Sequence, residues 1–158
     1  MLRLSCALLL LLAVTSCKEG GSAADHGDLD LMSYGLPIKI QAPSGAKVST
    51  EDLGFMKDVT VKGDGNFSLQ ILNGTASTTD VSKIIQEQMD EAKAGPFFAE
   101  VVQEDASGFI FKKQVTEERI NYDFRSVKIQ GDQEYIFRTG MMGQFTLDEV
   151  KAMYDSVQ

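Results

Sequence analysis

The side chains that most often carry out chemistry are scarce in this chain. Its 158 residues include two cysteines and one histidine, His26. A nucleophilic triad needs a histidine between its nucleophile and its acid, and an imidazole metal site needs further donors. Phosphate-loop, dinucleotide-binding and nucleophile-elbow motifs do not occur either. We therefore expect a non-enzymatic protein that uses no cofactor and no metal ion.

Carboxylates are the remaining candidates for acid–base catalysis. Glu104-Asp105 and Glu117-Glu118 stand as adjacent pairs, and two carboxylates flanking a bond are the catalytic pair of glycosidases. Adjacent residues on a strand point to opposite faces, however, and both pairs lie at the ends of expected strands. Solvated surface carboxylates are the simpler interpretation, which we favour.

Cys17 has the most specific chemical setting of any residue here. It ends the tetrapeptide Val14–Cys17 and follows an apolar run, Leu8–Val14, that begins shortly after Arg3. This run is shorter than the ~20 apolar residues of a spanning helix and has the length of a signal-peptide hydrophobic region. The arrangement resembles a bacterial lipoprotein signal with its lipobox.

That resemblance implies cleavage before Cys17, a diacylglycerol group on its thiol, and usually a third acyl chain on the new amino terminus. Residues 1–16 are then a signal peptide, and Cys6 leaves with it, so the mature domain has no disulfide. Two or three chains anchor a protein stably, because each buried methylene contributes ~0.8 kcal/mol. An ordinary secretory signal cut within residues 13–16 is the alternative.

The charge balance limits the possible partners. The chain has 15 Lys and Arg against 23 Asp and Glu, a net charge of −8. Such a protein repels polyanions, so we expect no nucleic-acid partner and membrane attachment through the acyl chains on Cys17. Lys18 is not the aspartate that often retains lipoproteins at the inner membrane, which favours the outer membrane. The inner membrane, the periplasmic side of the outer membrane and the cell surface all stay open.

Composition divides the rest of the chain in two. Residues 17–30 are small, polar and turn-rich, and we interpret them as the acylated Cys17 followed by a flexible tether. Residues 31–158 form a single domain by length and patterning.

Alternating apolar residues predict strands around 37–41, 46–48, 59–62 and 67–71, with a hairpin turn at Gly63–Asn66. Further strands are predicted from Phe98 to Val102 and through Phe109, Phe111, Tyr122, Phe124, Val127, Ile129, Tyr135 and Phe137. The inward parity changes near Ser126, which predicts a β-bulge or bend there.

Two amphipathic helices complete the pattern. Residues 79–94 carry one apolar face, start at Thr79 or Asp80 and stop at Gly95. The second helix begins at Thr146-Leu147-Asp148-Glu149, which is a capping box. The fold class predicted is α+β: an antiparallel sheet with a helix after the first strands and a C-terminal helix packed on it.

This order of elements resembles the PsbP-like fold, which is shared by the extrinsic photosystem II protein, a Ran-binding nuclear import factor and small bacterial envelope lipoproteins. The resemblance covers about residues 35–158 and rests on the Leu36-Pro37-Ile38 strand, the mid-chain helix and the strands between Phe109 and Phe137. It implies a binding or assembly factor rather than an enzyme. It transfers no binding residue, because no motif places one.

Two surface features are candidate binding sites. Polar positions expected to point outward from the sheet include most of the scarce cations: Lys39, Lys62, Lys112, Arg125 and Arg138, with Gln41 and Gln70 among them. If they gather on one face, that face attracts an acidic partner; an ordinary solvated sheet face is the alternative. The second feature is Met141-Met142 between two glycines, either an adaptable contact loop or a plug for the core.

We expect a lipid-anchored, non-enzymatic protein of the bacterial envelope that binds or scaffolds another envelope component, with an envelope protein as the expected partner. The alternative is a small-ligand binding module with a pocket between the sheet and the helices.

Overall fold

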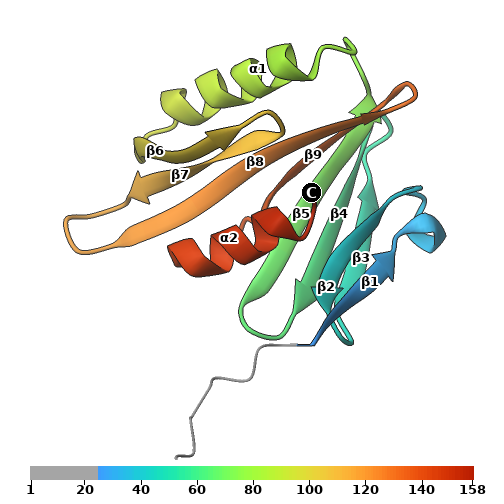
Figure 1. Ribbon diagram of the computed structural model, residues 1–158, viewed down its shortest axis with the longest axis horizontal. Coiled ribbons are helices and arrows are strands. Elements are labelled where there is room, and N and C mark those ends of the chain that lie inside the picture. Colours follow the sequence, from blue (N-terminus) through green and yellow to red (C-terminus); the bar gives the residue numbers. More distant parts are fainter. Residues whose placement is uncertain (1–24) are drawn as a thin grey trace, which may run out of the picture.

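The computed structural model describes residues 25–158, which form one α+β domain dominated by antiparallel strands (Figure 1). The strands are β1 His26–Asp30, β2 Lys39–Pro43, β3 Lys47–Asp52, β4 Met56–Gly63, β5 Phe67–Thr75, β6 Phe98–Asp105, β7 Gly108–Gln114, β8 Ile120–Gln130 and β9 Gln133–Thr139. The helices are α1 Val81–Ala94 and α2 Leu147–Asp155, with a short 3-10 turn at Met32–Tyr34. The α+β class predicted from the sequence is confirmed at this level.

Seven of the strands form one sheet in the order β3-β4-β5-β9-β8-β7-β6, and β1 pairs with β2 separately. All neighbours are antiparallel. The central strand β9 lies between β5 and β8, so residues near position 70 come beside residues near position 138. This pairing of distant segments builds the site described below.

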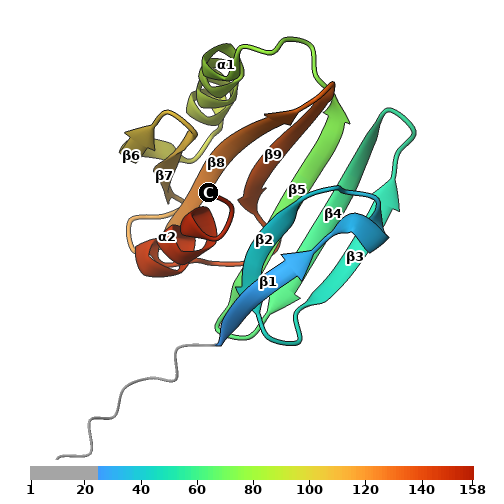
Figure 2. The same cartoon turned by 45° about the vertical axis from the view of Figure 1, so that its right-hand side comes forward.

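One face of the large sheet is covered by the β1–β2 pair and by α2. Figure 2 shows both in front of the sheet. The larger apolar cluster lies between these layers and includes Ile40 of β2, Ile71 of β5, Phe137 of β9 and Met153 of α2. Burial of this kind is the main favourable contribution to folding.

The opposite face is covered only in part. There α1 packs over β6 and β8, and Ile84, Ile85 and Met89 form a smaller apolar cluster with Phe109 and Phe111 of β7. Two helices on one sheet are expected from the sequence, and the structure adds that they lie on opposite faces. The side chains of β3, β4 and β5 on the α1 side of the sheet stay outside this cluster, and we call this region the open face.

The bulge or bend predicted near Ser126 does not appear as a register shift in the pairing of β8. β8 pairs with β7 up to Ser126 and with β9 from Ser126 onward, and neither ladder has a register shift. The irregular pairs lie between β6 and β7 instead. The apolar residues of β8 change from even to odd positions because this strand is covered on both faces of the sheet. Phe124 faces the cluster under α2, whereas Val127 faces the cluster under α1.

The local predictions are otherwise close to the structure. Asp80 rather than Thr79 caps α1 by accepting from the backbone N–H of Lys83, and the capping box of α2 is complete. The Gly63–Asn66 turn joins β4 to β5, with positive φ at Gly65 and Asn66.

The predicted tether boundary needs a correction. His26–Asp30, placed in the tether of 17–30, forms β1 and pairs with β2, for example Leu29 with Ile40. The signal peptide 1–16 and Cys17 lie outside the described residues. Within residues 25–158, no helix is long and apolar enough to cross a membrane.

Candidate functional site

The predicted positive face holds only three of its five cations. Lys62 of β4, Arg125 of β8 and Arg138 of β9 share the α1 side of the sheet by their strand register. Lys112 lies on the other side, opposite Tyr122, and its Nζ is 3.4 Å from Glu100. Lys39 belongs to the separate β1–β2 pair, where it lies 3.7 Å from Asp30. Adjacent positions on a strand point to opposite faces of a sheet, and both faces of this sheet carry polar residues. Alternation in the sequence therefore does not show which of the five cations share a face.

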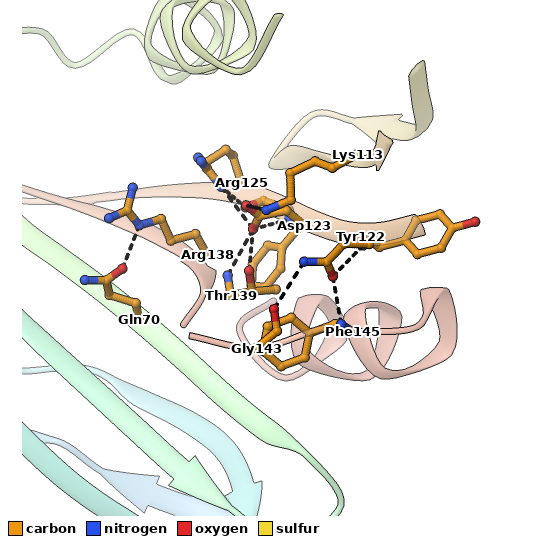
Figure 3. A network of polar contacts seen from close by, with 11 residues as sticks. Gln70, Lys113, Tyr122, Asp123, Arg125, Arg138, Thr139, Gly143 and Phe145 are labelled. Atoms are coloured by element: carbon orange, nitrogen blue, oxygen red, sulfur yellow. Dashed lines mark hydrogen bonds and ion pairs between the residues drawn. The ribbon is translucent and has the colours of Figure 1, made fainter. Parts of the chain in front are cut away.

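Asp123 of β8 is the centre of a polar network on this side of the sheet (Figure 3). Its Oδ1 accepts hydrogen bonds from the hydroxyl of Thr139 at 2.7 Å and from the backbone N–H of Thr139 at 3.3 Å. Two cations also contact it: Arg125 Nη1 lies 3.1 Å from Oδ1, and Lys113 Nζ lies 3.0 Å from Oδ2. The buried carboxylate is thus paired and fully hydrogen-bonded, as a buried charge must be.

These contacts hold Asp123 in its ionised form. Burial by itself raises the pKa of this carboxyl, but Arg125, Lys113 and the Thr139 hydroxyl together outweigh it and hold the pKa below its ordinary value. The two cations also stack near the ring of Phe111, with the guanidinium carbon of Arg125 5.4 Å and Lys113 Nζ 5.9 Å from its centroid. Aromatic contacts of this kind favour cations at partly desolvated sites.

Arg138 lies beside this network and points along the sheet toward β5. Its Nε donates to Oε1 of Gln70 at 2.8 Å, and the amide of Gln70 donates to Asp58 of β4. Among the described residues its hydrogen bonds use Nε alone, so both Nη groups are available to a ligand. Burial and then the nearby Arg125 guanidinium lower the pKa of Arg138, which means that an anion placed between the two would relieve their repulsion.

A hollow of about 210 Å³ opens at this point, and we call it the cationic hollow. Its walls include Lys113, Asn121, Asp123, Arg125, Arg138 and Met141. Three cations therefore face a single carboxylate, in a chain whose overall charge is strongly negative. The arrangement favours an anionic group, because paired guanidinium groups bind carboxylates and phosphates in a fixed fork geometry.

A second hollow of about 320 Å³ adjoins the first at Gly140 and Met141 on the open face. We call it the polar hollow, and its walls include Ser49, Glu51, Asp58, Thr60, Ser68 and Gln70. Within the described part of the chain, Ser68 Oγ and Asp58 Oδ1 are buried without a hydrogen-bond partner. A buried polar group without a hydrogen-bond partner costs about 1–3 kcal/mol of stability. A polar ligand that hydrogen-bonds to Ser68 or Asp58 would remove this cost.

The Met141-Met142 segment forms the rim shared by these hollows and does not plug the core. The two side chains are 79% and 84% exposed, and Phe145, at 2% exposure, fills the end of the core instead. Asn121 fastens the segment to β8: its amide donates to Gly143 O at 3.2 Å, and its carbonyl oxygen accepts from Phe145 N at 2.7 Å. The rim therefore combines two exposed apolar side chains with an anchored backbone.

Sequence reasoning missed the residues that organise the site, namely Lys113, Asn121, Asp123 and Thr139. One signal was available for Asp123, since it stands two residues before Arg125 and four before Val127 on the same face of β8. Two oppositely charged residues on the same strand face as an apolar residue indicate a polar cluster at the edge of a core. The contact with Thr139 has no such signal, because it depends on how β9 returns past β8.

No cluster of three metal-binding side chains occurs within residues 25–158, and His26 packs against the ring of Phe67 at 5.9 Å. The site offers a ligand cations, hydroxyl groups and an apolar rim. Comparisons with family models, curated proteins and solved structures found no match to this chain.

Proposed function

We propose that this protein is a lipid-anchored, non-enzymatic component of the bacterial envelope that binds another envelope component through an anionic group held in the cationic hollow. One observation carries the binding part of the proposal. Lys113 and Arg125 pair with the single carboxylate of the cationic hollow, and Arg138 lines the same hollow, although the chain as a whole is acidic. Electrostatic complementarity of this kind selects partners and speeds their encounter.

The anchoring part of the proposal rests on the sequence around Cys17. Mass spectrometry of the amino-terminal peptide from membranes tests it directly. We expect a peptide that begins at Cys17 and carries two or three acyl chains, and loss of the protein from the membrane fraction in Cys17→Ala. An unacylated amino terminus, or a Cys17→Ala protein that stays membrane-bound, contradicts this part.

The PsbP-like fold is also a proposal. It draws support from the α+β class, the antiparallel sheet and the terminal helix opened by Thr146-Leu147-Asp148-Glu149. Members of that fold mostly bind or assemble, which is consistent with a binding role here.

In-cell crosslinking tests the binding role at the proposed place. A photo-reactive residue at position 142 of the full chain should capture an envelope component, whereas the same residue at position 32, exposed beside β1, should not. Arg138→Glu should reduce the adduct about tenfold or more, since hydrogen bonds to a charged group contribute about 1.5–3 kcal/mol. Lys128→Glu, an exposed substitution outside both hollows, is the matched control.

Two outcomes contradict the binding role: no adduct from position 142, or an adduct whose yield is independent of residue 138. A diffusible small ligand is the second candidate, favoured by the combined size of the two hollows, which reaches the range of about 300–1,000 Å³ typical of ligand sites. It predicts ligand binding by the purified protein without any captured envelope component.

A further inference from the structure

The polar hollow has the wrong chemistry for a second anion. Its wall contains two carboxylates, Glu51 and Asp58, and one lysine, Lys62. The remaining polar groups there are uncharged hydroxyls and the amide of Gln70. An acidic peptide or a second phosphate placed in it would meet like charge.

The same groups suit a ligand rich in hydroxyls. A hydroxyl both donates and accepts, so it can donate to Asp58 Oδ1 and accept from Ser68 Oγ, two of the buried atoms left without partners in the described part of the chain. Ser68 is only 8% exposed, and Thr60 and Ser49 add further hydroxyls in the same wall.

The two hollows are connected through a continuous set of hydrogen bonds. Asp58 in the polar hollow accepts from Gln70, and Gln70 accepts from Arg138, which faces the cationic hollow. The exposed Met141 side chain stands at the rim of both. A ligand that spans them would present an anion on one side, hydroxyls on the other, and C–H groups to the methionine.

We propose that the adjoining hollows bind an anionic saccharide, with its carboxylate or phosphate against Arg138, Arg125 and Lys113 and its ring hydroxyls against Ser68 and Asp58. This inference rests on the proposed function and names the chemical class of its ligand. An acidic peptide fits less well, because it brings further negative charge to Glu51 and Asp58 and no hydroxyl for the unpaired atoms.

Calorimetric titration of the full-length protein in neutral detergent tests the inference. The probes are glucose 1-phosphate, glucose 6-phosphate and glucuronate, with glucose, inorganic phosphate and triglutamate as comparisons. We expect at least one of the first three to bind about tenfold more tightly than each comparison, because only these ligands occupy both hollows.

Two variants divide the contributions of the hollows. Arg138→Ala should reduce the affinity for the tightest sugar acid or sugar phosphate to that for glucose. Ser68→Ala should reduce the affinity for the same ligand toward the affinity for inorganic phosphate. The melting temperature should stay equal or rise, since the substitution removes a buried hydroxyl that has no partner. Lys128→Ala should leave the affinity unchanged.

Three results overturn the inference: phosphate bound as tightly as any saccharide probe, triglutamate bound more tightly than all of them, or no binding of any probe. The first two leave the cationic hollow as a site for a different anion, so the proposed function survives them. The crosslinking from position 142 decides the proposed function separately, because it does not depend on which ligand class is offered.

Discussion

The hydroxyl of Thr139 donates a 2.7 Å hydrogen bond to Oδ1 of Asp123, at the point where β9 and β8 separate. The backbone pairs of these strands end at Ser126 and Phe137. Beyond that end, Asp123 accepts the N–H of Thr139 at 3.3 Å and so replaces a backbone partner. The Asp123 carboxylate thus links β8 to β9 beyond their last backbone pair and also pairs with Lys113 and Arg125 of the cationic hollow.

Removal of the Asp123 carboxylate should destabilise the protein strongly. Asp123→Ala leaves buried Arg125 without its counter-ion, and breaking a buried ion pair by removing one partner typically costs about 3–5 kcal/mol. Urea unfolding measures this loss. Lys39→Ala removes an exposed pair with Asp30 and should cost about 0–1 kcal/mol. Equal losses for the two variants would contradict the central role of Asp123.

The stability of the protein in acid should depend on the ionisation of Asp123. Because the folded-state pKa of Asp123 lies below its unfolded value of ~3.9, its ionisation stabilises the fold above that pH, and this contribution is lost as the pH falls through the folded pKa. Asp123→Asn should therefore lower the melting temperature most near neutral pH, and the difference from the wild type should shrink as the pH falls below ~3.9. A difference that widens in acid would show that another group dominates.

Glu134 should have the opposite dependence on pH. Burial, and then the charge of Glu87 on α1, raise the pKa of Glu134. A carboxyl group whose pKa is higher in the folded than in the unfolded protein destabilises the fold once the pH exceeds its pKa in the unfolded protein, ~4.3 for Glu. Glu134→Gln should therefore raise the melting temperature at pH 7 and have little effect at pH 3.5. The exposed Glu118→Gln serves as the control, and a gain confined to pH 3.5 would refute the assignment.

The capping box of α2 should contribute measurably to stability. Thr146 accepts from the N–H of Glu149, and Glu149 accepts from the N–H of Thr146 at 2.7 Å. Thr146→Ala should cost about 0.5–2 kcal/mol with an unchanged denaturant slope. Thr79→Ala, next to the true cap Asp80 of α1, should change stability little. Similar costs at both positions would mean that the capping geometry does not matter.

Substitution of the rim methionines should separate binding from folding. Met141 and Met142 are highly exposed, so changing both to serine should leave the melting temperature nearly constant and weaken the capture of the envelope component. Phe145→Ala should instead cost about 3–5 kcal/mol, since it empties a buried site. A large drop in melting temperature for the double methionine variant, with capture intact, would refute the contact role of the rim.

The sequence by itself determined the local structure of this protein. Alternation located most strands, Asp80 and the Thr146–Glu149 box marked the helix starts, and the Gly63–Asn66 turn marked a hairpin. Each signal acts between residues close in the chain, so it does not depend on the rest of the fold. The β1 strand escaped this reasoning, because His26–Asp30 is polar and its partner β2 lies a dozen residues away.

Tertiary structure alone decided which residues form the site. The alternation in β8 is compatible with a bulge at Ser126 until one knows that α1 and α2 cover opposite faces of the sheet. The pairing of β5 with β9 brings Gln70 to Arg138, and the register of β7 brings Lys113 to the side of Asp123. Alternation shows that a strand has two faces. Only the packed fold shows what covers each face, and therefore which charges lie buried together.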